Sequence, residues 1–353
     1  MTALAHAPDA PDAGDLLVSI INYRTAELTQ ACVTSVIEDL AASPGITARI
    51  AVVDNASGDG SVETLRDWIA GLQTKVPVTL IASARNTGFS GGHNIGLRSA
   101  RARMALVLNS DAVLRPGCCA ALLAAMEAQP QAGLFAPRIE HEDGEQQVNC
   151  FRMHTPASEL DRGAATGPVS RLLRRWRVAL DMPPEGEIGW ASFACIGLRG
   201  TMLGQVGAMD EGYFLYFEDT EYGLRARRAG WSIAYVPEAR MVHYRGGSAP
   251  VKSLSQARKR LPAYYYASRT RLFYQAHGRI GLWAANLGWH LGRGLSQLRR
   301  LTGRAPQPGV AHEARDIWIN ALRPLGPDHA PEGAGARPDT QAPRTVASTE
   351  AAR

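Results

Sequence analysis

Residues 48–61 read ARIAVVDNASGDGS, and this stretch shows how the first half of the chain is built. Its apolar run, rich in β-branched residues, is typical of a buried strand, and it stops at the acidic residue Asp54. Asn, Ser, Gly and Asp follow, which all favour turns, and a helix is predicted over 61–72. A strand with a polar residue at its end, a turn and a helix therefore form the basic unit of this region.

The same order of elements occurs on both sides of that stretch. Further strands are predicted over 16–22, 78–83 and 104–111, and further helices over 25–42, over 93–102 and after the last strand, with Pro116 in the first turn. This alternation predicts an α/β fold with a doubly wound, mainly parallel sheet. Because ligands bind beyond the carboxyl ends of such strands, we expect Asn22, Asp54 and Asp111 at one crevice.

The pattern becomes looser after about residue 138. Residues 139–187 contain charged and Pro/Gly-rich stretches that favour a long excursion or lid. Two short strands around Pro237 and two amphipathic helices are predicted beyond it, the helices over 261–278 and 281–301. We divide the chain into a disordered leader (1–14), a main domain (15–250) whose halves meet near residue 138, a basic and aromatic helical extension (251–305) and a largely disordered tail (306–353).

Composition narrows the class of protein. The chain has 353 residues, 45% of them hydrophobic, and its five cysteines are scattered without a CxxC pair. No apolar run approaches the roughly 20 residues that cross a bilayer, and the polar N-terminus does not resemble a secretory signal. These features predict a cytoplasmic protein with reduced thiols. No Asp or Glu occurs between Glu238 and Glu313, so this basic segment is suited to nucleotide diphosphate, nucleic acid or anionic lipid.

Several polar motifs have both a functional and a structural explanation. Asp54 could accept from a nucleobase or ribose, or it could serve the turn. The glycine-rich loop RNTGFSGGHNIG (85–96) exposes N–H groups to a phosphate but is neither GxGxxG nor a Walker loop. Asp111 could hold Mg²⁺ or Mn²⁺ or cap a helix, and His243 could be a ligand or a packed residue. Glu218, Asp219 and Glu221 follow the aromatic run GYFLYF, which indicates either a surface helix or a reacting site.

Seven blocks in order carry a family resemblance. They are VSIINYRT, VVDNASGDGS, RNTGFSGGHNIG, LNSDAVLRPG, WASFACIGLRG, GYFLYFEDTEYGLRARRAGW and YVPEARMVHYRGGS. Together they closely resemble inverting family-2 glycosyltransferases of the rhamnosyltransferase-like branch, over residues 16 to about 275. The resemblance implies a GT-A fold, with a nucleotide-sugar half over about 15–138 and an acceptor half over about 139–250. It also implies a nucleotide-sugar donor and a divalent metal, Mg²⁺ or Mn²⁺.

The resemblance also implies roles for single residues. Nucleotide-sugar contacts would come from Asn22, Asp54, Arg85, Asn86, Gly91, Gly92, Asn94, Asn109 and Ser110. Asn109-Ser110-Asp111 takes the place of the DXD metal motif, so Asp111 would bind the metal and His243 would complete its shell. Trp190 and Tyr216 would flank the sugar and acceptor. Glu218-Asp219 matches the ED motif, in which Asp219 would be the catalytic base and Glu218 could orient the acceptor.

The expected reaction is a displacement at the anomeric carbon. An acceptor hydroxyl attacks opposite the leaving diphosphate, which requires a carboxylate to take the proton and a cation to neutralise the diphosphate. The resemblance suggests a dTDP- or UDP-sugar donor, with L-rhamnose as the sugar of that branch, and a glycan or polyprenyl-linked acceptor.

Two other functions are weighed against this one. A sugar-nucleotide pyrophosphorylase would need a Gly-rich basic loop after the first strand, where this chain has NYRTAE. A non-catalytic phosphate- or RNA-binding protein could use the acid-free segment, but no RNA-binding module is apparent and no nucleic acid is expected. The helices of that segment would either contact the inner face of the cytoplasmic membrane or pack on the catalytic domain.

Overall fold

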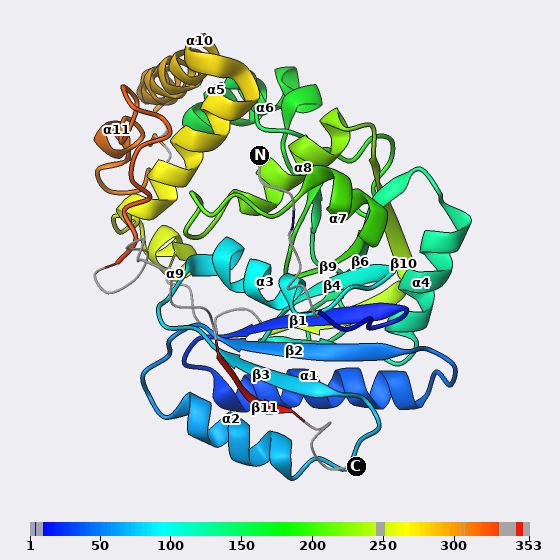
Figure 1. The fold of residues 1–353 in the computed structure, drawn as a ribbon. Helices are drawn as coiled ribbons and strands as arrows, with labels where there is room; N and C mark the ends of the chain where they lie inside the picture. Colours follow the sequence, from blue (N-terminus) through cyan, green and yellow to red (C-terminus); the bar gives the residue numbers. More distant parts are fainter. Residues whose placement is uncertain are drawn as a thin grey trace.

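A computed structural model describes residues 4, 10–244, 251–303, 305–306, 308–331 and 344–348, the last of these as backbone only (Figure 1). The predicted disorder of the leader and of the far end of the tail lies mostly outside these residues. Among the described residues, no helix has the length and apolar character that crossing a membrane requires. All five cysteines are buried and free.

A nine-stranded sheet forms the centre of the molecule, in the order β11-β3-β2-β1-β4-β9-β6-β10-β5. The β3-β2-β1-β4 and β6-β10 neighbours are parallel, whereas β9, β5 and β11 run antiparallel to the strands beside them. The mainly parallel, mixed α/β sheet is therefore confirmed. The strands are β1 (Leu16–Asn22), β2 (Ala48–Asp54), β3 (Val78–Ala82), β4 (Met104–Asn109), β5 (Ala112–Leu114), β6 (Ala132–Glu140), β9 (Cys195–Arg199), β10 (Ser232–His243) and β11 (Arg344–Ser348).

Helices cover both faces of this sheet. Leu16, Val18 and Ile20 of β1 pack in one cluster with α1 (Ala26–Ala41), α2 (Ser61–Ala70) and α4 (Cys118–Ala128). The alternate residue Leu17 packs on the opposite face, beside Ile95 of α3 (Gly88–Arg98). Because both faces are covered, the strands of the first half are mostly apolar on both of their sides, as the sequence pattern indicated.

Three local predictions need correction. Helix α3 begins at Gly88 rather than 93, so the glycine-rich stretch lies inside the helix and not in a loop before it. Pro116 precedes α4, whose N-cap is Gly117 in the left-handed region. The two strands predicted around Pro237 form the single strand β10, whose pairing with β6 shifts in register between Val236 and Arg240. A proline donates no ladder hydrogen bond, and the irregular register accommodates it.

The second half of the chain adds smaller elements around the sheet. They are β7 (Cys150–Phe151), α5 (Pro156–Ala164), α6 (Gly167–Leu172), η1 (Arg174–Trp176), β8 (Trp190–Ala191), α7 (Gly200–Val206), α8 (Glu218–Arg228), α9 (Val251–Gln256), α10 (Ala263–Gln297), η2 (Leu298–Thr302) and α11 (Glu313–Asp316). Gly278 interrupts α10 with a φ of 68°, close to the break expected between two helices. Figure 1 shows α5 and α10 side by side, at the opposite end of the molecule from α2.

The basic helices pack closely on the rest of the protein. A Cβ at Gly163 of α5 would lie 2.3 Å from the Trp289 carbonyl oxygen of α10, so glycine permits this contact. Arg269 of α10 is buried and bonds Glu159 of α5 at 2.7 Å. Packing on the protein therefore accounts for one side of α10 both before and after Gly278.

Part of the predicted disordered tail is ordered. Residues 308–331 lie against α10, and Ile317 is fully buried in the cluster that contains Tyr266 and Trp289. The acidic residue Asp316 of this segment pairs with Arg260 at 2.6 Å. The segment supplies both an apolar side chain and the negative charge that the basic extension lacks, which explains why it folds onto that extension.

Candidate active site

Polar side chains at the ends of β1 and β2 bond to one another. The amide of Asn22 donates to Asp54 Oδ2 at 2.7 Å, and the hydroxyl and N–H of Ser57 donate to the same carboxylate at 2.6 and 3.1 Å. Only 1% of Asp54 is exposed. These bonds fit the turn explanation, and the predicted contact of Asp54 with the donor base or ribose stays a prediction.

The start of α3 is built around its glycines. Gly88 has a φ of 69°, and a Cβ there would lie 2.1 Å from the Phe214 carbonyl oxygen, so only glycine fits. A Cβ at Gly91 would lie 2.5 Å from the Thr87 Cβ, and one at Gly92 would lie 2.8 Å from the Ile21 Cδ1. These glycines allow the helix to approach its neighbours closely, so packing explains them without a phosphate.

Asn94 and Asn86 have structural partners in place of the predicted ligand. Asn94 is fully buried, and its amide bonds both backbone groups of Met209 and the Glu211 carboxylate at 2.9–3.0 Å. This side chain ties α3 to the segment that leads into α8, and its predicted place beside the nucleotide stays a prediction. Asn86 accepts from the Asn55 amide at 3.1 Å, and Arg85 beside it is half-buried.

The predicted metal ligands come together from distant parts of the chain. β5 pairs antiparallel with the end of β10, and the Tyr244 N–H bonds the Asp111 carbonyl at 3.0 Å. As a result, His243 Nε2 lies 3.2 Å from Asp111 Oδ1, with both side chains largely buried. Within the described part of the chain, no three His, Cys, Asp or Glu side chains gather into a metal cluster. An imidazole and a carboxylate side by side nevertheless fit a divalent cation that takes its other ligands from a diphosphate and water.

The backbone ahead of α8 is strained. Tyr216 and Phe217 have φ angles of 72° and 68°, a left-handed conformation that bulky side chains rarely adopt. The surrounding protein holds this turn in place, because the Phe214 carbonyl accepts from the Phe89 N–H at 2.8 Å and the Leu215 carbonyl accepts from the Ser268 hydroxyl at 3.3 Å. Strain of this kind, about 1–3 kcal/mol per residue, is concentrated at functional sites.

The acidic pair at the start of α8 is held in a poorly hydrated place. Burial, together with the neighbouring charge of Asp219, raises the pKa of Glu218 well above its usual range. Burial also raises the pKa of Asp219 to about 6, although the N–H and hydroxyl of Thr220 oppose the shift. Glu218 Oε2 finds no hydrogen-bond partner among the described residues. Glu221 pairs with Arg225 at 2.6 Å, but its Oε2 also lacks a hydrogen-bond partner among the described residues, and burial raises its pKa as well.

One short segment joins the acidic pair to the 109–111 motif. The N–H of Phe193 bonds the Asp219 carboxylate, and the carbonyl of the next residue, Ala194, accepts from the Asn109 N–H at 2.9 Å. The hydroxyl of Ser110 in turn lies 3.1 Å from that of Thr25, behind the end of β1. The structure therefore brings the predicted base and the predicted metal motif to the two sides of residues 193–194.

Several aromatic side chains lie near the acidic pair of α8. Trp190 stacks on Phe151 with ring centroids 4.1 Å apart, and its indole N–H donates to the Arg152 carbonyl. Phe217 lies 5.3 Å from Tyr265, which also meets the edge of Tyr216 at 5.7 Å. Sequence reasoning found Trp190 and Tyr216 but missed Phe151 and Tyr265, because nothing local marks two aromatic residues that meet from separate elements.

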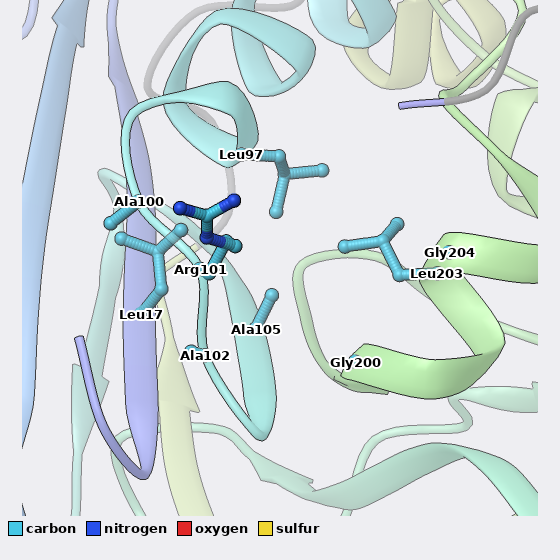
Figure 2. Close-up of a pocket in the computed structure, with 9 residues that line it drawn as sticks. All are labelled: Leu17, Leu97, Ala100, Arg101, Ala102, Ala105, Gly200, Leu203 and Gly204. Atoms are coloured by element: carbon cyan, nitrogen blue, oxygen red, sulfur yellow. The ribbon is translucent and has the colours of Figure 1, made fainter. Parts of the chain in front are cut away.

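A cavity of about 190 Å³ lies elsewhere, between the start of β1, the end of α3 and α7. Figure 2 shows the Arg101 guanidinium among Leu17, Ala100 and Leu97, with Leu203 of α7 on the other side of the cavity. The cavity contains none of the predicted site residues and no carboxylate, so it is separate from the site described above.

Comparison with known proteins agrees with this architecture. The sequence profile described as glycosyl transferase family 2 matches residues 17–164. An N-acetylglucosaminyl-diphospho-decaprenol L-rhamnosyltransferase of Mycobacterium tuberculosis (strain CDC 1551 / Oshkosh) is 30% identical over an alignment of 269 residues that covers 71% of this chain and 81% of that protein. The chain belongs to glycosyl transferase family 2. It is therefore an enzyme, a glycosyltransferase, as the sequence blocks predicted.

Other relatives of this family-2 glycosyltransferase are more distant. A low-salt glycan biosynthesis hexosyltransferase of Haloferax volcanii is 25% identical over 65% of this chain and 67% of its own length. Among solved structures, a mannosyltransferase of Pyrobaculum calidifontis in complex with GDP-Man and Mn²⁺ is 14% identical with a TM-score of 0.51, over 91% of this chain and 84% of that one. The likeness to such structures confirms the GT-A fold.

Proposed function

We propose that this glycosyltransferase moves a hexose or deoxyhexose from a dTDP- or UDP-sugar to a hydroxyl of a glycan or polyprenyl-linked oligosaccharide, with inversion at the anomeric carbon. The relative from Mycobacterium tuberculosis, an L-rhamnosyltransferase whose name gives a decaprenyl diphosphate acceptor, supports this donor and acceptor class. The observation that carries the proposal is the acidic pair of α8, which is poorly hydrated and joined through residues 193–194 to the 109–111 motif.

Asp219 would take the proton from the acceptor hydroxyl. A carboxylate with a pKa near 6 is still ionised at neutral pH, yet it is a stronger base than an ordinary aspartate. The hydrogen bonds from Thr220 fix one oxygen of the carboxylate and leave its orientation defined. The aromatic residues around α8 would limit the access of water, which would otherwise compete with the acceptor.

Asp111 and His243 would hold the divalent cation. A bound cation would neutralise charge on the leaving diphosphate. An imidazole ligand suits Mn²⁺ better than Mg²⁺, because Mg²⁺ prefers oxygen ligands throughout. We therefore expect Mn²⁺ to support donor binding at lower concentration than Mg²⁺. We further propose that the enzyme acts in the cytoplasm, peripherally on the inner face of the membrane.

The two other functions gain no support from the site. The residues after β1 form no glycine-rich loop, and Arg24 among them is bonded to the Ser57 carbonyl at 3.0 Å. Three arginines of the acid-free segment, Arg260, Arg269 and Arg271, are paired with carboxylates of other segments. Neither a pyrophosphorylase loop nor an extended phosphate- or RNA-binding face is built from these residues.

The test is a donor screen with the purified full chain. UDP-, dTDP- and GDP-sugars are added with Mn²⁺, with Mg²⁺ or with a chelator, and thermal unfolding is followed. A true donor at about 100 times its Kd stabilises the folded state by about 2.7 kcal/mol, and this gain should require metal. Asp111→Ala should abolish the additional stabilisation that the metal provides, whereas Glu142→Ala, at an exposed acid in another loop, should keep it.

Transfer to a soluble analogue of the lipid-linked acceptor completes the test. The configuration of the new glycosidic bond, read by NMR, reports inversion or retention. Metal-independent stabilisation that is the same in Asp111→Ala and in the unmodified chain would remove the cation from the proposal.

A further inference from the structure

The second half of α10 presents an apolar stripe to solvent. Ile280 is 87% exposed, Leu291 58% and Leu301 84%. We define the α10 stripe as the exposed apolar side chains Ile280, Trp283, Leu287 and Leu291 of α10, together with Leu298 and Leu301 of η2, which directly follows it. Isolated exposed apolar residues are ordinary, but a continuous apolar patch on a protein surface marks a binding surface.

Helical spacing places these residues on one side. They recur at intervals of three, four and seven residues, and over 280–298 the stripe is about 27 Å long at 1.5 Å per residue. The opposite side of the same helix is buried at Leu282, Trp289 and Gly292. A Cβ at Gly292 would lie 2.2 Å from the Leu160 carbonyl oxygen of α5, so that side is already fully used. The helix is therefore apolar on both sides. The stripe side is covered only in part by the described residues, at Trp283, whose ring meets that of Trp318 edge-on at 5.8 Å.

The charges around the α10 stripe are of one sign. Arg279 and Arg300 are exposed at its two ends. The sequence has no Asp or Glu between Glu238 and Glu313. The stripe is therefore bordered by cations that an anionic surface would complement.

The charge pattern decides between two possible occupants. A second copy of the chain, stacked stripe to stripe, would bring arginine-rich surfaces together without an acid from the same segment to pair with them. An anionic bilayer offers phosphates to the arginines and acyl chains to the apolar residues, as for other amphipathic helices that lie in a membrane interface. We propose that the α10 stripe lies on an anionic membrane surface, with its apolar side chains among the acyl chains and its arginines at the head groups.

Contacts of the first half of α10 connect this surface to the active site. Arg271 binds both oxygens of Asp210 at 2.9 and 3.0 Å, and the Tyr213 hydroxyl donates to the Gln275 amide oxygen. Both partners lie in the segment that leads directly into α8. A membrane contact through the second half of α10 would therefore hold the acidic pair in a fixed orientation to the bilayer. This inference rests on the proposed lipid-linked acceptor for its purpose, although not for its physical basis.

The test measures vesicle binding by the full chain. Flotation with vesicles of phosphatidylcholine alone, or with phosphatidylglycerol added, gives the bound fraction at low and high salt. We expect binding to require phosphatidylglycerol and to fall by about tenfold or more in the double variant Leu287→Gln/Leu291→Gln. Arg279→Gln/Arg300→Gln should weaken binding roughly fivefold for each arginine and flatten the salt dependence.

Ala70→Gln is the matched control, because Ala70 is exposed at the end of α2, far from α10. It should bind vesicles as the unmodified chain does. Equal vesicle binding by the double leucine variant and the unmodified chain would overturn the proposal. So would an unmodified chain that ignores vesicles but runs as a dimer that the leucine variant converts to monomer, since a second copy would then cover the stripe.

Donor-induced thermal stabilisation, measured on the same variants, separates this inference from the proposed function. The α10 stripe variants should keep that stabilisation, because the substituted side chains face solvent. If no nucleotide-sugar stabilises any of the proteins, the proposed function fails while the vesicle data still decide the docking surface.

Discussion

The acid at the end of β2 and the acids at the start of α8 are all removed from bulk water, but their surroundings differ. Asp54 receives three hydrogen bonds from Asn22 and Ser57. Glu218 has one oxygen without a partner among the described residues, and burial raises the pKa values of both Glu218 and Asp219. The first group is a finished polar network, and the second is a pair of acids held where their charge is unfavourable.

This difference suggests that Asp54 is a structural acid and that the acids of α8 are reactive ones. A satisfied network makes the strand ends rigid, so the residues that these ends carry stay in fixed positions. An unsatisfied buried acid destabilises the folded protein, and it persists only because contacts elsewhere offset that cost. Such contacts occur around α8. The absence of a side chain at Gly88 lets the Phe214 carbonyl approach closely, and Arg271 forms an ion pair with Asp210. Predictions that separate structural from reactive acids follow from this comparison.

The largest effect is expected at Asp219. Asp219→Asn removes the proton acceptor but keeps the shape and hydrogen bonds of the side chain, so kcat should fall by about 10²–10⁴-fold. Donor-induced thermal stabilisation should be unchanged if the proposed role holds, because a base of this kind contacts the acceptor and not the donor. A steady-state assay and a thermal shift on the same sample provide both readings. Lost donor binding with the loss of rate would move Asp219 out of the base role.

The next largest effect is expected at Asp54, in the hydrogen-bonded network at the end of β2. Asp54→Ala should lower the free energy of unfolding by about 3 kcal/mol without any ligand, because it strands buried donors of Asn22 and Ser57. Urea unfolding of the donor-free protein measures this. Asp59→Ala is the control, since Asp59 is an exposed acid in the same turn and should cost about 1 kcal/mol or less. If Asp54→Ala leaves unfolding unchanged but weakens donor binding, the acid is a ligand and not a structural residue.

The sequence predicted the strands around Asp54 better than the surroundings of α8, for a physical reason. Strands β1 to β4 follow local apolar runs, so their bounds agree with the predictions to within one or two residues. Helix α3 was started too late because glycines have low helix propensity, and tight packing on Ile21 and Phe214 overrides that propensity. The pairing of His243 with Asp111 required β5 and β10 to meet, which no local pattern encodes.

Around α8 the sequence indicated the acidic residues but not all of the aromatic side chains that lie beside them. The acids behind an aromatic run were visible, and the family resemblance gave Asp219 its role. The contacts of Tyr265 with Phe217 and Tyr216 arise from the fold of α10 onto this segment. The same limit explains residues 308–331, whose order depends on an apolar and acidic fit to α10 that composition alone does not reveal.

The pH dependence of transfer tests the raised pKa of Asp219 directly. Because a base must be deprotonated, kcat should be constant above about pH 7 and fall about tenfold per unit below the pKa of about 6. Unfolding must be checked at each pH so that the loss reflects titration. A rate that stays constant down to about pH 4.5 would mean that the base titrates as an ordinary exposed aspartate.

The smallest effect, and the one of opposite sign, is expected at Glu218. Glu218→Gln replaces a buried acid by a neutral group of the same size, so it should stabilise the protein by up to about 1 kcal/mol at neutral pH. The raised pKa fixes the sign: the stability from the bound proton is fully present below the unfolded pKa of about 4.3 and is lost as pH rises through the folded pKa.

The gain of Glu218→Gln should accordingly vanish at acid pH, and urea unfolding near pH 4 and pH 7.5 measures both values. Glu159→Gln is the control, because the charges of Arg162 and Arg269 outweigh the effect of burial and hold the pKa of Glu159 well below its usual range, so this variant should destabilise at neutral pH instead. Two buried glutamates would then respond in opposite directions. Equal destabilisation by both variants would show that Glu218, like Asp54, belongs to a finished polar network.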